Sequence, residues 1–208
     1  MWPSSHLAIG YLLYSGYTHL RYRHSPEEFP TLLVLFGSLL PDLIDKPLWL
    51  AGVVSTGRAL GHSILFVFPV IAVVCAITYC QRGETDSAVG FGVSITAASI
   101  FDGLEQFLHG SLVVDLEEVS FWVWPLELPA ERIVDQLQIT PGVAQAIAHK
   151  PSWTAENIPR HPELGLWIRG FEIVVTVLAL CVWAYDSTPG WQTCRYLGQW
   201  TRERIAIR

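Results

Sequence analysis

Five mostly apolar stretches organise the chain. They cover residues 7–20, 31–44, 63–79, 87–108 and 164–185. A helix needs about 20 apolar residues to span a bilayer. The third and fifth stretches have that length, and the fourth has it if its carboxylates face inward. The first two reach it only by recruiting residues 2–6 and the stretch after Pro41. The pattern predicts an all-α, multi-span transmembrane helical bundle of about five helices. The alternative is a buried helical bundle that lies only partly in the membrane.

The pattern changes between the fourth and fifth stretches, so we divide the chain into four parts. Residues 1–109 are expected to form a four-helix membrane core, 110–163 an extramembrane insertion, 164–186 a fifth membrane helix and 187–208 a basic tail. The insertion carries eight Asp or Glu residues and the aromatic run Phe121-Trp122-Val123-Trp124-Pro125. Long loops of this kind are usually functional lids or linkers, and Trp favours the headgroup level of a bilayer. We therefore expect a lid that also anchors at the membrane interface.

Composition agrees with a membrane protein. Charged residues make up 15% of the 208 residues and hydrophobic residues 51%, whereas soluble domains average about 25% charged residues. Such a chain is too apolar for intrinsic disorder. Its net charge of −6 gives no basic footprint for a nucleic acid. The expected location is the cell membrane, and the expected partner is the lipid bilayer.

Ionisable residues at the ends of the apolar stretches are the candidate functional groups, because such residues are costly at membrane depth. They are His6, Asp42, Asp45, His62, Asp102, Glu105 and His109. Successive spans alternate in direction, so the start of the first, the end of the second, the start of the third and the end of the fourth lie at one membrane face. Five spans therefore bring all seven residues to one level, where the insertion also leaves and returns.

Imidazole and carboxylate together are the ligand set of catalytic zinc and similar divalent ions. Asp42 and Asp45 are three residues apart, so both can point the same way on a helix. Each residue also has an ordinary structural interpretation. For example, Asp42 after Pro41 can belong to a turn, and Asp102 can pair with Arg58 or Arg169 across the bundle.

The order of several short motifs along the chain resembles that of a known protein family. An early His6 and an apolar helix are followed by Leu40-Pro41-Asp42-Leu43-Ile44-Asp45 and then Gly57-Arg58-Ala59-Leu60-Gly61-His62-Ser63. This order resembles the YdjM-type family of membrane-bound metal-dependent hydrolases, which is distantly like zinc-dependent phospholipase C. The likeness covers most of residues 1–126. It implies an all-helical fold and metal ligands at His6, Asp42, Asp45, His62 and Asp102.

The chain departs from the family pattern at one position. The His expected four residues before Asp102 is Ala98, so Glu105 or His109 is the expected replacement ligand or general base. The leading hypothesis is a membrane-bound hydrolase that uses a divalent metal ion, zinc first, on a phosphoester or other ester of a membrane-associated anionic substrate. Arg58 would hold the anion, since guanidinium binds phosphate oxygens bidentately.

Two other functions stay open. Ala98 favours a non-catalytic membrane scaffold or partner-binding module with a degenerate metal site. A small transporter is a third hypothesis. It is weakened because the carboxylates gather at one end of the spans, whereas transporter sites lie near mid-bilayer.

Overall fold

A computed structural model of the chain describes residues 2–54, 57–83, 85–109, 120–126 and 162–191, with four further positions up to 199. Most of the expected insertion and tail lies outside these residues. The described part contains no strand. Its elements are α1 (Pro3–Tyr22), α2 (Glu28–Leu50), α3 (Ile64–Arg82), α4 (Asp86–His109), the short 3₁₀ helix η1 (Ser120–Val123) and α8 (Pro162–Tyr185). The prediction of an all-α bundle of about five helices is confirmed.

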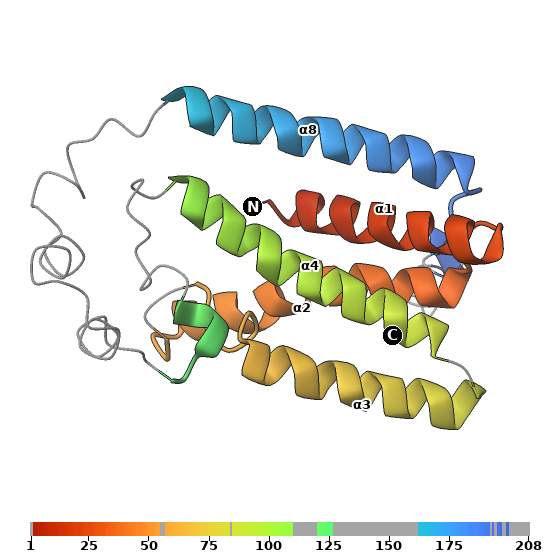
Figure 1. Ribbon diagram of the computed structural model, residues 1–208, viewed down its shortest axis with the longest axis horizontal. Coiled ribbons are helices and arrows are strands. Elements are labelled where there is room, and N and C mark those ends of the chain that lie inside the picture. The colour runs from red at the N-terminus through yellow and green to blue at the C-terminus, as the bar shows by residue number, and fades with distance from the viewer. Residues whose placement is uncertain are drawn as a thin grey trace, which may run out of the picture.

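The five long helices lie side by side, with their axes roughly along one direction (Figure 1). Helix α4 is the centre of the bundle because it packs against α1, α2, α3 and α8, whereas α3 and α8 are peripheral. Small residues on α4, among them Ala88, Ser94 and Ala98, are buried at these contacts. Small side chains let helices approach closely in membrane proteins, so the sequence of α4 suits its central place.

Local signals set the helix ends that matter for the site. Helix α1 begins with Pro3 in its first turn, where the missing N–H of proline costs nothing. Helix α3 begins after Ser63, whose Oγ accepts a hydrogen bond from the N–H of Leu65, as an N-cap does. It ends at Arg82 and is followed by the cap residue Gly83, which has a φ of 71°; glycine is favoured in this left-handed cap conformation.

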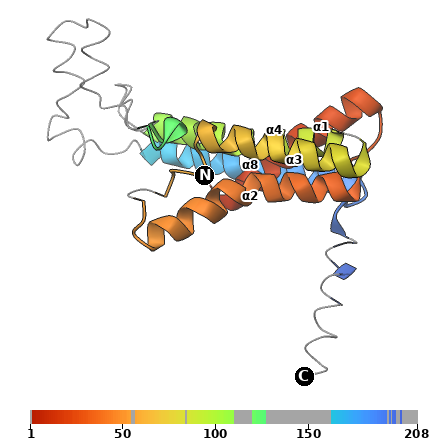
Figure 2. The ribbon, with the colours of Figure 1, turned by 90° about the horizontal axis from the view of Figure 1, so that it is seen from below.

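The first two helices extend beyond their apolar stretches. Helix α1 already includes His6, and α2 continues through Pro41 and Pro47 to Leu50, so Asp42 and Asp45 lie inside it. Proline within a helix removes a hydrogen bond and commonly kinks the axis. Figure 2 shows that α2 changes direction along its length. Its final turns therefore reach the end of the bundle at which the insertion departs.

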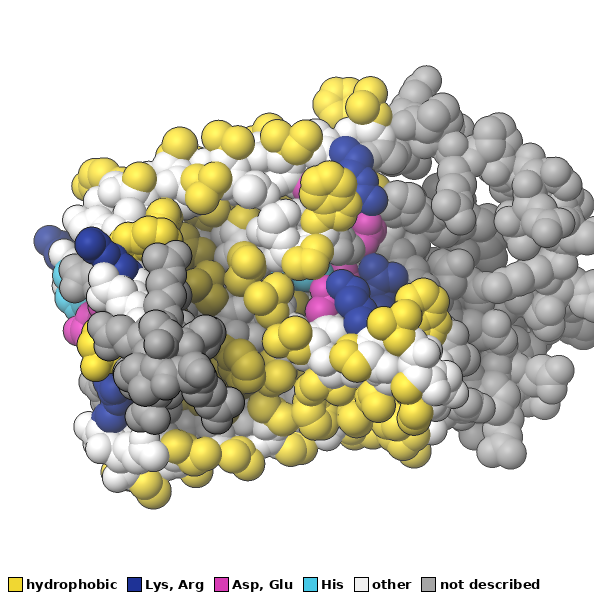
Figure 3. All heavy atoms as spheres, turned by 180° about the vertical axis from the view of Figure 1, so that it is seen from behind, with side chains coloured by type: hydrophobic (Ala, Val, Ile, Leu, Met, Phe, Trp, Pro, Cys, Tyr) yellow, Lys and Arg dark blue, Asp and Glu magenta, His cyan; other side chains and the backbone are white. Residues whose placement is uncertain are grey.

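Within the described part of the chain, three helices are long and apolar enough to cross a membrane: the segments Ile64–Arg82, Asp86–Glu105 and Leu166–Tyr185. The first and last are mostly exposed, and the middle one is mostly buried. Large apolar side chains such as Phe68, Val73 and Val174 point outward from α3 and α8. In Figure 3 the charged side chains of the visible face gather near the two ends of the bundle, with a mainly apolar or uncharged band between them. This is the surface of a protein that spans a bilayer.

Candidate metal centre

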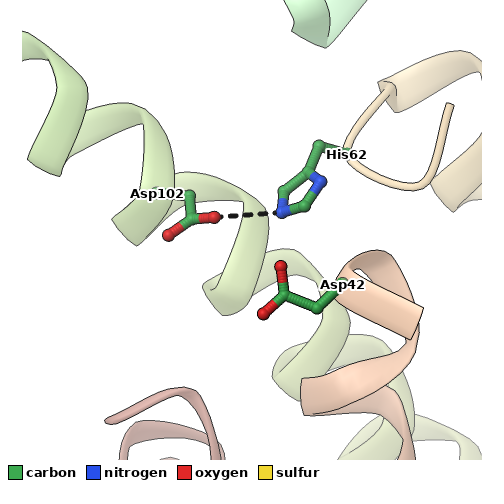
Figure 4. A group of neighbouring side chains, drawn as sticks. All are labelled: Asp42, His62 and Asp102. Atoms are coloured by element: carbon green, nitrogen blue, oxygen red, sulfur yellow. Dashed lines mark ion pairs between the residues drawn. The ribbon is translucent and has the colours of Figure 1, made fainter. Parts of the chain in front are cut away.

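Three buried side chains from three parts of the chain meet at one end of the bundle. Asp42 comes from α2, His62 from the loop before α3 and Asp102 from α4. Each offers one ligand atom, and these three atoms lie within 4.8 Å of one another. Figure 4 shows the three side chains pointing toward a common space. Their exposed fractions are only 8%, 1% and 2%, so the bundle encloses two carboxylates and an imidazole.

His6 adds a second imidazole from α1. Its Nε2 lies 3.2 Å from Asp102 Oδ1, and Nε2 of His62 lies 3.1 Å from Asp102 Oδ2. Both Nε2 atoms are buried, and neither has a hydrogen-bond partner among the described residues. The ring nitrogens therefore approach the carboxylate without the alignment of a hydrogen bond. Buried polar atoms are almost always satisfied, and here both nitrogens face the same carboxylate at ion-pair distance. A cation shared by the two imidazoles and Asp102 would satisfy all three groups.

Asp45 contacts the His62 ring at Nδ1, on the side away from Asp102. Nδ1 of His62 lies 2.8 Å from Asp45 Oδ2, which also accepts a hydrogen bond from the N–H of Ala59. Asp45 Oδ1 accepts from the N–H of Gly61. A carboxylate on Nδ1 fixes the ring orientation and leaves Nε2 for a metal, which is the usual arrangement around metal-binding histidines.

The loop that carries His62 lies directly on α2. A Cβ atom at Gly61 would come within 2.6 Å of the carbonyl oxygen of Pro41 and 2.8 Å of its Cα. Only glycine permits this close approach of two backbones. The same contact brings His62 next to Asp42, so Gly61 and Pro41 bring the two candidate ligands together.

Two basic side chains border the group. Lys46 Nζ lies 2.6 Å from Asp42 Oδ2, one helical turn away. Arg58 donates from Nε to Asp102 Oδ2 at 3.0 Å and pairs with Glu105 at 3.2 Å. Burial works against the charged form of Arg58, but the carboxylates of Asp102 and Glu105 outweigh it and raise the pKa of Arg58. The guanidinium therefore stays charged beside the carboxylates.

Burial and the nearby carboxylates also have opposite effects on the pKa of the His62 imidazole. Burial disfavours its charged form, but the facing carboxylates of Asp102 and Asp45 outweigh burial and raise its pKa. A metal ion binds only neutral imidazole, so binding of a cation at Nε2 must displace any proton held there.

The short helix η1 covers the group. The ring of Phe121 meets the ring of His62 edge-on, with centroids 5.9 Å apart. The indole N–H of Trp122 donates to the carbonyl of Ser99 on α4. Ser63 Oγ donates to the carbonyl of Trp124 at 2.6 Å. The aromatic run of the insertion is thus attached to both α3 and α4 directly over the candidate ligands.

The donors present fit a divalent cation. Asp42, His62 and Asp102 supply oxygen and nitrogen ligands of the kind that zinc and similar ions take. The Nε2 atoms of His62 and His6 both lie beside Asp102 and make no hydrogen bond among the described residues. Spacings of 3.1 and 3.2 Å between donor atoms suit neighbouring ligands around one ion, since each donor lies about 2.0–2.2 Å from bound zinc.

The structure places most of the residues expected at this face near one another. Asp42, His62 and Asp102 form the group, and His6 adjoins it. Asp45 contacts the far side of the His62 ring, and Glu105 pairs with Arg58. The roles expected for these residues stay predictions. The expectation for His109 lies outside the described side chains.

Two further contacts were not expected from the sequence. Lys46 pairs with Asp42, and its position four residues later on a helix was an available signal. The docking of Trp122 on α4 carried no local signal. A Cβ on Gly103 would collide with the Trp122 indole, so this glycine, next to Asp102, makes space for the covering segment.

Comparison with known proteins places the chain in a family. The YdjM inner membrane protein family matches residues 1–188, which include all five long helices. No curated protein and no solved structure gives a significant match. The match agrees with the three candidate spans and with the expected membrane location. This multi-pass membrane protein, with its buried Asp42–His62–Asp102 group, belongs to the YdjM inner membrane protein family.

Proposed function

We propose that the protein is a membrane-bound, divalent-metal-dependent hydrolase that acts on a phosphoester or other ester of a membrane-associated anionic substrate. One observation carries the proposal. The buried Nε2 of His62 has no hydrogen-bond partner among the described residues, although it lies beside Asp102 and within ligand-sharing distance of Asp42. A core histidine with a purely structural role would be expected to be satisfied.

In this proposal His6, Asp42, His62 and Asp102 hold the ion, with zinc as the first choice. When bound, a divalent ion supplies Lewis acidity toward a phosphoryl or carbonyl oxygen and activates water at neutral pH. Asp45 is a positioning residue, because it holds Nδ1 of His62 and two backbone N–H groups. Asp45 was expected to be a metal ligand. In this proposal it instead orients the ligand His62.

Arg58 and Lys46 are proposed to hold the anionic part of the substrate. Both lie at the group, and both keep part of their side chains exposed, 30% and 48%. Glu105 is the proposed general base, because its pairing with Arg58 keeps it next to Asp102. His109 is the alternative base from the same helix.

The position of the group along the bundle suggests where the substrate lies. Asp102 is within one turn of Glu105, the last residue of the α4 membrane segment. Trp122 and Phe121 cover the same end. Aromatic residues favour the level of the headgroups. A lipid-attached ester at the membrane surface is therefore the substrate class that best fits this end of the bundle.

Metal analysis of detergent-purified full-length protein tests the metal proposal. The wild type should bind at least one zinc ion that is lost in both His62→Ala and Asp102→Ala. His24→Ala is the matched control, because His24 is exposed and bonded to the neighbouring Ser25 carbonyl. Equal zinc content in all four proteins would contradict the proposal.

Hydrolysis assays test the reaction. The zinc-loaded protein should cleave a chromogenic phosphodiester, a phosphomonoester or a carboxylic ester, and His62→Ala should abolish that activity. A protein that binds zinc through His62 but cleaves none of these probes, nor phospholipid vesicles, would favour the second function below.

The second candidate is a non-catalytic membrane scaffold with a degenerate metal site. The observation in its favour is that Arg58 pairs with Asp102 and Glu105, which gives both carboxylates a cationic partner without a metal. Ala98, one turn before Asp102, is buried and small. Ala98→His should then raise zinc affinity strongly, and Ala98→Phe, a bulky control without a ligand atom, should not. Activity that is already present in the wild type would contradict this candidate.

A further inference from the structure

A second polar cluster lies at the opposite end of the bundle. Tyr11, Ser15 and His19 follow one another at intervals of four along α1, so they share one helix face. They face Asp186, which comes directly after the last residue of α8. In Figure 1 these ends of α1 and α8 lie at the end of the bundle opposite to η1. His6 and His19 are 13 residues apart, which is about 20 Å along a helix.

The carboxylate of Asp186 is buried, and only one of its two oxygens accepts hydrogen bonds from the described part of the chain. Its Oδ2 accepts hydrogen bonds from Tyr11 Oη and Ser15 Oγ, both at 2.7 Å. Its Oδ1 has no hydrogen-bond partner among the described residues, and the side chain is 0% exposed. A buried carboxylate oxygen without a hydrogen bond is costly, so Oδ1 has the capacity to bind a cation.

His19 presents a nitrogen to this oxygen. Its Nδ1 lies 2.9 Å from the carbonyl oxygen of Ser15. A carbonyl only accepts, so Nδ1 carries a hydrogen and donates it. Nε2 then lies 3.3 Å from Asp186 Oδ1, outside hydrogen-bond geometry. The ring is 37% exposed, so a ligand can reach the pair from outside the bundle.

We propose that His19 Nε2 and Asp186 Oδ1 form a second metal site, for a borderline divalent ion such as zinc, with water completing the coordination. Imidazole nitrogen with carboxylate oxygen suits such ions. Both ligands carry the supports expected around a metal. His19 donates its other ring N–H to a backbone carbonyl, and the second oxygen of Asp186 is held by two hydroxyl groups. This site joins α1 to the end of α8 and is independent of the proposed hydrolase activity.

Zinc titration of the metal-stripped full-length protein in detergent tests the site. His62→Ala serves as the parent, because it removes the candidate metal centre at the other end. The parent should bind one zinc ion, and adding His19→Gln should abolish this binding event. Adding His24→Gln, which changes an exposed histidine near the same helix end, should leave it unchanged.

Cobalt binding gives a second readout. Co²⁺ added to the His62→Ala parent should produce visible absorption bands that are lost with His19→Gln. Asp186→Asn should lose the same bands. Because Asp186 is buried and that variant can fail to fold, the decisive comparison is the half-exposed His19. If the parent binds no ion, or if His19→Gln binds as its parent does, the pair holds only a proton and the proposal is wrong.

Discussion

The carboxylate of Asp45 lies behind the imidazole of His62, with Oδ2 2.8 Å from Nδ1. This contact joins α2 to the loop before α3 and leaves Nε2 of His62 facing Asp42 and Asp102. Two backbone N–H groups, from Ala59 and Gly61, complete the hydrogen bonds of Asp45. These three groups of the described residues all donate to the carboxylate.

Asp45→Asn is expected to weaken zinc binding. The amide nitrogen would face one of three donors, so the ring of His62 would lose its fixed orientation. Loss of such an outer partner typically lowers metal affinity by about 10- to 100-fold. Zinc titration of the stripped protein measures the change. The melting temperature without metal separates this effect from a general loss of folding, and zinc affinity equal to that of the wild type would contradict the positioning role.

Arg58→Gln is expected to separate metal binding from substrate binding. Removing the cation from beside Asp102 and Glu105 should leave zinc affinity unchanged or make it tighter, because the carboxylates then lack a competing positive charge. The KM for a phosphodiester should rise, because the anion loses its bidentate partner. A neutral carboxylic ester serves as the control substrate, and an equal rise in its KM would argue against an anion-binding role.

Gly103→Ala is expected to loosen the cover over the metal group. The new methyl group would collide with the indole of Trp122 and break its hydrogen bond to the Ser99 carbonyl. We expect a chelator to remove zinc faster, since Phe121 and Trp122 shield His62. Gly170→Ala is the matched control, because a Cβ there meets no atom within 4 Å. Identical rates of zinc removal in both variants would show that the segment does not limit access.

Val73→Arg is expected to impair membrane insertion of α3. Val73 lies at the middle of the segment Ile64–Arg82, and its side chain is 57% exposed. A charge at the centre of a membrane helix costs about 2.5–3.5 kcal/mol on insertion scales. Cysteine accessibility on the two sides of the membrane measures the inserted fraction. Tyr79→Arg, near the end of the same helix, should insert normally because its charge can reach the interface.

The sequence predicted the bundle and much of the site, because both depend on patterns along the chain. Apolar stretches gave the helices, and alternating span direction predicted that Asp42, His62 and Asp102 would meet. The continuation of α2 through Pro41 was less evident, since proline commonly ends a helix.

The missed features depend on contacts between distant segments. Asp45 and His62 are 17 residues apart, and their contact requires the loop to fold back on α2. Ser15 and Asp186 are 171 residues apart and are joined only by the packing of α1 on α8. No local periodicity encodes such pairs, so the His19–Asp186 cluster becomes visible only in three dimensions.

Helix α8 is synthesised after all four of the proposed metal ligands. His6, Asp42, His62 and Asp102 all precede the insertion, whereas α8 begins only at Pro162. A nascent chain therefore contains these four side chains long before the ribosome has made its last long helix. Docking of α8 on α1, through Glu172 and the main-chain N–H of Trp2, is then a late step in biogenesis. In the metal proposal, all four ligands are therefore available to an ion before α8 docks on α1.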